Sequence, residues 1–181
     1  MDIFAEILVS RKFTNQDKKK IKMYFASIIF SSVVLVLVVP MVALTKGIAY
    51  ISTVSMLLFA AIVFVIWREL KAMQLEFEYI IVNNNIDFDK IVAKKKRTRL
   101  VSADLKLVEE IGVYNPSRFV NSNFGAEFHT ERDVNSGANY YMIFPHNEYK
   151  RTLVVFTPDD KMFEALSKTL PRQLLKELPK N

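Results

Sequence analysis

The chain of 181 residues lacks cysteine altogether and contains only two histidines and four glycines. Without cysteine it forms no disulfide framework, thiolate zinc site, iron–sulfur cluster or cysteine nucleophile. The histidines, His129 and His146, are too few for an imidazole metal site, and the isolated glycines form no phosphate-binding loop. We therefore expect no metal, no cofactor and no catalytic residue. The hydrophobic share of 51% also excludes a disordered or collagen-like chain.

Two long runs without a charged residue, 23–45 and 47–67, account for much of that hydrophobicity. Each is long enough for a helix rising ~1.5 Å per residue to cross a hydrocarbon core of ~30 Å. Neither run has the polar stripe of a soluble surface helix. A cleaved signal peptide fits less well, because the first run is too long and no small-residue cleavage site follows it. The sequence thus predicts a two-helix transmembrane hairpin over 23–71, with its tight turn at Gly47.

Basic residues predict the orientation of this hairpin. The turn contains only Lys46, whereas six basic residues precede the first run: Arg11, Lys12, Lys18, Lys19, Lys20 and Lys22. The positive-inside rule therefore predicts a multi-pass protein of the inner or plasma membrane with both termini in the cytoplasm. Residues 1–74 hold nine Lys and Arg against four Asp and Glu, which is five of the six net positive charges. The basic pI thus reflects topology, and we expect no nucleic-acid partner.

The amphipathic, basic segment 1–22 has two interpretations. Its apolar residues at positions 3, 4, 7 and 8 predict a short helix over residues 2–9. In the first interpretation the segment is an interfacial anchor beside the first span, formed by Phe4, Ile7, Leu8, Arg11 and Lys12. In the second, the helix packs on the soluble domain.

After the hairpin the hydrophobic period changes from helix to strand. Alternation over 75–82 and 86–92, separated by three asparagines, predicts a β-hairpin. Further strands are predicted over 97–102, 106–114, 127–131 (a short edge strand), 140–144 and 149–156. Asp159 and Asp160 begin a C-terminal helix of about eleven residues. The predicted soluble domain therefore covers 75–181.

Six or seven antiparallel strands followed by one helix is the element order of a pleckstrin-homology (PH) domain. Several short motifs extend the likeness over most of the chain: Met1-Asp2, Phe4, Glu6, Val9, Arg11-Lys12 and Thr14, then 86–91, 99–105, Leu153, Phe156, Pro158 and 170–172. On these residues the chain resembles an uncharacterised bacterial family of two-pass membrane proteins with a C-terminal PH-like domain. The resemblance implies an α+β fold in which the hairpin precedes a β-barrel or sandwich capped by a helix. It implies no activity.

One cluster suggests a binding site. Lys94, Lys95, Lys96, Arg97 and Arg99 follow the second predicted strand of the domain, where they could contact the phosphates of anionic lipids. The alternative is a solvated turn that adds to the positive-inside bias.

The sequence therefore predicts a membrane-anchored binding or scaffolding protein that performs no covalent chemistry. Its partners would be the lipid bilayer, anionic lipids, another membrane protein or further copies of the chain. Two alternatives remain: an accessory subunit of a membrane transport or channel complex, and an enzyme with an unrecognised carboxylate site.

Overall fold

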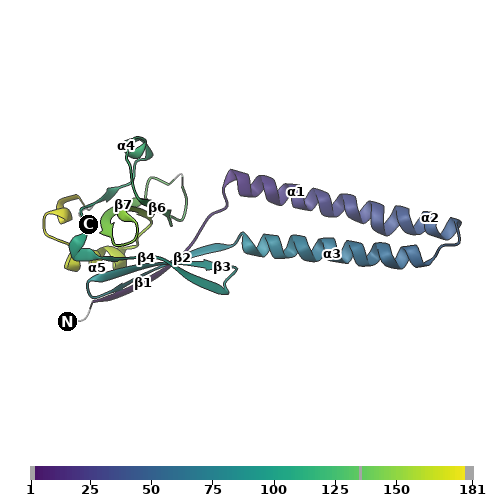
Figure 1. Ribbon diagram of the computed structural model, residues 1–181, viewed down its shortest axis with the longest axis horizontal. Coiled ribbons are helices and arrows are strands. Elements are labelled where there is room, and N and C mark those ends of the chain that lie inside the picture. Colours follow the sequence, from purple (N-terminus) through teal and green to yellow (C-terminus); the bar gives the residue numbers. More distant parts are fainter. Residues whose placement is uncertain (1–2, 135, 178–181) are drawn as a thin grey trace. The chain divides into compact units, whose positions relative to one another are not determined.

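The computed structural model describes residues 3–134 and 136–177 and divides the chain into two compact units (Figure 1). One unit is Phe13–Met73, and the other combines Met1–Lys12 with Gln74–Asn181. The second unit is therefore built from both ends of the chain, and the first is an insertion within it.

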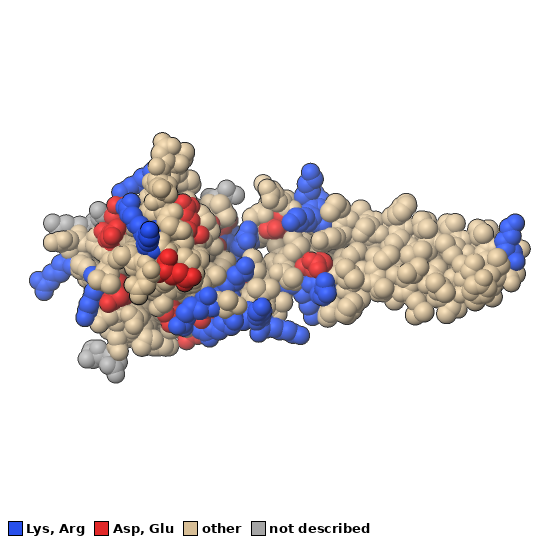
Figure 2. Space-filling model, viewed as in Figure 1, with Lys and Arg blue, Asp and Glu red and all other residues tan. Residues whose placement is uncertain are grey.

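The inserted unit is a helical hairpin. It consists of α1 (Asn15–Ser32), a π-helical segment (Val33–Val38), α2 (Val39–Thr45) and α3 (Tyr50–Ala72). Thr14 and Asp17 form a capping box at the start of α1, and Gly47 takes the left-handed φ of 69° in the turn. Both continuous helices, Asn15–Thr45 and Tyr50–Ala72, are long and apolar enough to cross a membrane. Figure 2 shows an uncharged surface along the middle of this unit.

The π-helical segment has a local cause. Pro40 lacks an N–H group and its ring crowds the carbonyl four residues earlier, which disrupts the α-helical pattern. The N–H of Val39 accordingly donates to the carbonyl of Val34, five residues back. The helix is therefore wider over 33–38 and returns to α geometry in α2.

Four antiparallel strands form the first sheet, in the order β1-β2-β3-β4. They are β1 (Phe4–Ser10), β2 (Leu75–Val82), β3 (Asn85–Val92) and β4 (Lys96–Asp104). The predicted hairpin of 75–82 and 86–92 is confirmed as β2 and β3, with Asn83 at a φ of 55° in its turn.

The predicted helix over 2–9 is wrong for the residues that the structure describes, because Phe4–Ser10 form β1, whereas residue 2 lies outside the described residues. Seven register pairs join β1 to β2, from Phe4↔Val82 to Ser10↔Glu76. Ala5 and Val9 are buried while Phe4 and Leu8 are exposed, which is the alternation of a strand. An isolated helix this short is marginal in water, whereas the strand gains a full set of bonds to β2. The unit that contains the two sheets therefore begins before the hairpin, and the domain boundary predicted at residue 75 omits its first strand.

The second sheet has the order β5-β7-β8-β6. Its strands are β5 (Glu110–Val113), β6 (Ala126–His129), β7 (Tyr140–His146) and β8 (Lys150–Phe156). β6 is an edge strand as predicted, but it runs parallel to β8, so the sheet is mixed rather than wholly antiparallel. The predicted strand 106–114 is shortened by a 3₁₀ turn at Leu105–Leu107 (η2). Two more short helices are α4 (Pro116–Phe119) and η3 (Leu174–Glu177).

The core lies between the two sheets and is closed by α5 (Asp160–Thr169), the predicted C-terminal helix. The rings of Tyr79, Phe88 and Phe156 pack at its centre, with centroids 5.4–5.9 Å apart. Met162 and Leu166 of α5 are fully buried against them. Asp159 caps α5 by accepting a hydrogen bond from the N–H of Met162 at 2.8 Å.

The insertion leads to a first prediction. Residues 1–12 joined through an Asn-Gly turn to residues 74–181 should fold as a soluble domain, because β1 is then retained beside β2. A fragment of 75–181 alone should unfold at lower denaturant concentration or aggregate, since it exposes the β2 edge and the core under β1. Circular dichroism during urea titration compares the two, and equal stability would contradict the role given to β1.

Candidate functional site: the charged face of the first sheet

The outer face of the first sheet carries a ladder of charged side chains across all four strands. The strands alternate, so residues whose neighbours enter the core lie side by side on this face. Its carboxylates are Glu6 of β1, Glu76 and Glu78 of β2, and Asp87 and Asp89 of β3. The predicted basic cluster lies directly beside them, on β4 and the turn before it.

Asp89 is the centre of this ladder and is only 3% exposed. Its carboxylate oxygens lie 2.6 Å from Nε of Arg97 and 3.1 Å from Nε of Arg99. The same guanidinium groups reach outward, with Nη2 of Arg97 2.7 Å from Glu78 and Nη2 of Arg99 2.7 Å from Asp87. The two arginines of the predicted cluster are thus ion-paired within the sheet.

Two groups on this face, Glu78 and Arg97, have raised pKa values. Desolvation raises the pKa of Glu78, and the neighbouring carboxyl of Glu6 raises it further, while Arg97 opposes both effects. The hydrogen bond to Asp89 is the main reason why the pKa of Arg97 lies above its usual value. Arg97 therefore compensates the negative charges of Glu78 and Asp89, which is a structural role.

The three lysines of the cluster are placed differently. Ala93 and Lys94 adopt left-handed φ values of 53° and 57°, which turn the chain between β3 and β4. Lys94 is 73% exposed and approaches Glu76 no closer than 4.0 Å. Lys95 and Lys96 are exposed and form no ion pair with any residue that the structure describes. Positive charge available to a ligand is therefore concentrated at 94–96.

The predicted anchor residues belong to β1 and the residues that follow it, and β1 and β4 are opposite edges of the sheet. Phe4 and Leu8 are exposed on β1, and Ile7 is half-buried. Arg11 continues the ladder by donating its N–H to Leu75. Lys12 donates its N–H to the carbonyl of Arg132 and pairs with Asp133 at 3.3 Å. Whether these residues contact a membrane stays a prediction.

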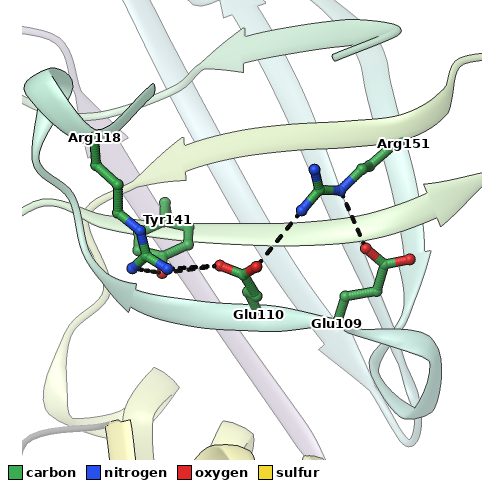
Figure 3. A network of polar contacts seen from close by, with 5 residues as sticks. All are labelled: Glu109, Glu110, Arg118, Tyr141 and Arg151. Carbon is green, nitrogen blue, oxygen red and sulfur yellow. Dashed lines mark hydrogen bonds and ion pairs between the residues drawn. The ribbon is translucent and has the colours of Figure 1, made fainter. Parts of the chain in front are cut away.

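A second polar network, on the outer face of the second sheet, was not predicted (Figure 3). Arg118 lies 2.6 Å from the hydroxyl of Tyr141 and 3.0 Å from Glu110. Arg151 bridges Glu109 and Glu110 at 3.3 and 3.5 Å. These contacts hold residues 114–125 over the sheet, with Tyr114, Phe119 and Phe124 packed there. No local pattern in the sequence predicts this network, because Arg118 and Arg151 lie far in sequence from some of their partners.

The two histidines have separate environments. Nδ1 of His129 lies 3.3 Å from the buried carboxylate of Glu131, and this hydrogen bond raises the pKa of His129. His146 accepts hydrogen bonds from the N–H groups of Glu148 and Tyr149 in the β7–β8 turn. Within residues 3–134 and 136–177, no group of three or more potential ligands could hold a metal ion.

Two facing sheets closed by a C-terminal helix define a PH-like fold. The chain matches the model of the bacterial PH-like domain family DUF6106 over residues 1–176 and belongs to this family. Because the match starts at residue 1, it includes β1 and the helical hairpin as well as β2 to α5. Neither the curated proteins nor the solved structures contain a match.

The charge ladder gives a second prediction. Asp89→Asn should destabilise the sheet by about 1–3 kcal/mol, because a nearly buried carboxylate with two guanidinium partners loses its charge. Asp87→Asn is the matched control, since Asp87 is more exposed and, among the residues that the structure describes, forms an ion pair with Arg99 alone. Hydrogen exchange of the β3 and β4 amides measures the local stability, and equal losses in both variants would refute the central place of Asp89.

Tyr79 gives a third prediction. Its buried hydroxyl donates to the carbonyl of Thr130 at 2.5 Å and accepts from the N–H of Thr157 at 3.4 Å. Desolvation raises the pKa of Tyr79 from 10.0 to about 12. The fold favours the neutral phenol, so this contribution to stability is complete below pH 10 and is lost as the pH rises toward 12.

The loss amounts to about 3 kcal/mol for a shift of this size. It should appear as a drop in the urea midpoint of the soluble domain between pH 10 and 12. Tyr79→Phe should lack this component of the drop while costing about 1 kcal/mol at neutral pH through its lost hydrogen bonds. Identical alkaline profiles for the two proteins would show that the buried phenol does not titrate in this way.

Proposed function

We propose that this protein is a membrane-tethered PH-like module that binds or scaffolds other molecules at the cytoplasmic surface of the inner or plasma membrane. The carrying observation is the β1·β2 ladder, in which Ser10 lies opposite Glu76 although the whole helical hairpin separates them in sequence. The first sheet contains one strand from before the hairpin and three from after it. It can form only if the hairpin brings the chain back to the place where it left β1.

The ladder supports the predicted topology. If α1–α2 and α3 each cross the bilayer, pairing of β1 with β2 requires residues before and after the hairpin to lie on the same side. The six basic residues before 23 and the single Lys46 in the turn favour the cytoplasm for that side. The domain is then held within a few residues of the lipid surface, which raises its effective concentration toward membrane-bound ligands.

Anionic lipid headgroups are the ligand that the charged turn supports. Lys95 and Lys96 have no ion-pair partner among the described residues, and Lys94 has only a long contact of 4.0 Å with Glu76. Each ammonium group contributes about 1 kcal/mol near an anionic surface. Arg97 and Arg99 play no direct part in this contact, because their guanidinium groups already hold Asp89 and its neighbours. The five predicted lipid-binding residues thus divide into three that contact lipid and two that support the sheet.

Binding without covalent chemistry is part of the proposal. A catalytic carboxylate must be free to accept or donate a proton to substrate. On the charged face, the most buried carboxylate is instead held by two guanidinium groups. This supports a structural role for the acidic residues of the sheet.

The fourth prediction tests the lipid contact by acetylation footprinting of the full-length protein in nanodiscs. The reactivity of Lys94, Lys95 and Lys96 should fall in bilayers of phosphatidylglycerol compared with phosphatidylcholine, and high salt should restore it. Exposed Lys106, on η2, is the control within the same molecule. Arg97→Gln should leave the lysine protection in place. Equal lysine reactivity in the two lipids at low salt would rule out the proposed contact.

A further inference from the structure

The strand β1 forms an open edge of the first sheet. The carbonyl of Ile3 accepts from the N–H of Asn83 at 2.8 Å, and the N–H of Arg11 donates to Leu75 at 3.0 Å. Hydrogen-bonded pairs alternate along an antiparallel ladder, so the odd-numbered residues of β1 bond to β2. The even-numbered residues therefore direct their main-chain N–H and C=O groups away from β2: Phe4, Glu6, Leu8 and Ser10.

This edge has few of the features that normally prevent strand addition, and Glu6 is the one charged residue of β1. The opposite edge, β4, has a register shift beside Asp89 and the charged residues Lys96, Arg97 and Arg99. Bulges and edge charges of this kind block pairing with another chain. β1 has an unbroken register, contains neither Lys nor Pro, and exposes Phe4 by 65% and Leu8 by 52%. Such an edge is suited to receive a further strand.

A groove of about 600 Å³ runs beside the first half of β1, with α5 as its other wall. Its lining is Ile3, Phe4, Ala5, Glu6, Lys161, Glu164, Ala165 and Lys168. Lys168 is paired with Glu164 at 2.6 Å, whereas Lys161 has no ion-pair partner in the part of the chain that the structure describes. The groove thus offers one carboxylate on its strand wall and one available ammonium on its helix wall.

We propose that a second copy of this chain occupies the edge, with β1 of each copy pairing antiparallel to β1 of the other. The two four-stranded sheets then become one continuous sheet across a two-fold axis. In this arrangement the exposed side chains of Phe4 and Leu8 lie on the same face of the joined sheet in both copies, so each copy covers part of the apolar edge of the other. Confinement of both copies to one membrane raises their effective concentration.

The ladder also selects a register. With Ile7 on the two-fold axis, Glu6 of one copy faces Leu8 of the other, and Phe4 faces Ser10. All seven residues of β1 are then paired. Placing Glu6 on the axis would set two carboxylates directly opposite, which destabilises a cross-strand pair. Placing Leu8 on the axis would shorten the overlap.

The register can be tested by disulfide formation, because the chain has no native cysteine. At the open edge Ile7 would face Ile7 of the second copy as a non-hydrogen-bonded pair, with Cα atoms about 4.5 Å apart. This separation lies within the range of about 4.4–6.8 Å that a disulfide spans. The full-length protein in native membranes is oxidised with copper phenanthroline and examined on non-reducing gels.

Ile7→Cys should give a disulfide-linked dimer, and an equal mixture of Glu6→Cys with Leu8→Cys should give one as well. Val120→Cys, 78% exposed on the same domain, is the control for random collision and should remain largely monomeric. Adding Leu8→Pro to Ile7→Cys should lower the dimer yield about tenfold, because proline removes an N–H of the open edge and leaves the bonds to β2 intact.

Other outcomes overturn the proposal. Absence of dimer from both Ile7→Cys and the mixed variants would exclude the β1 edge as the interface. Equal dimer from Val120→Cys would assign the crosslinks to collision. A dimer from Leu8→Cys alone would refute the register. Crosslinking of Ile7→Cys to a different protein would show that this protein, and not a second copy of the chain, occupies the β1 edge.

Discussion

The pairing of β1 with β2 is the constraint on which the rest of the structure depends. It joins residues 4–10 to residues 76–82, so the ladder forms only after the helical hairpin has returned the chain to its starting point. Closing so long a loop costs entropy, although that cost grows only slowly with length. The antiparallel helices α1–α2 and α3 reduce it by bringing residues 15 and 72 back to the same end of one compact unit. Formation of the helical hairpin therefore lowers the entropy cost of pairing β1 with β2, and that pairing in turn holds the two ends of the hairpin together.

The sequence predicts those elements whose signals are local. Charge-free runs reveal the two helices, alternation around three asparagines reveals β2 and β3, and Asp159 marks the start of α5. β1 was mispredicted because Phe-Ala-Glu-Ile-Leu-Val-Ser places apolar residues at both helical and strand spacing. Its state is decided by β2, which lies more than sixty residues away in sequence. The parallel pairing of β6 with β8 escaped prediction for the same reason, since short strands take their partner from the tertiary fold.

The candidate site likewise combines a feature that the sequence reveals with one that it does not. The charged residues can be read from the sequence, but their ion-pair partners depend on the fold. A cluster of five basic residues within 94–99 is visible in the sequence, but their role depends on the register that sets Asp89 opposite Arg99 and beside Arg97. The carboxylates that neutralise the arginines belong to strands β2 and β3, which the sequence predicts without their alignment to β4. The network around Arg118 and Glu110 was missed altogether, because it needs the fold of residues 114–125 over the second sheet.

The inserted hairpin also explains why β1 contains neither lysine nor proline to protect its open edge. A strand that must find its partner after a long insertion needs high β-propensity, and the Ile-Leu-Val stretch of β1 supplies it. Lysine in β1 would protect the outer edge but lower the β-propensity of the strand that closes the domain. β4 is under no such demand, since it follows β3 directly, and it can carry Lys96, Arg97 and Arg99. In the proposed dimer, pairing of β1 with a second copy would satisfy the open edge without any change to the residues that close the fold.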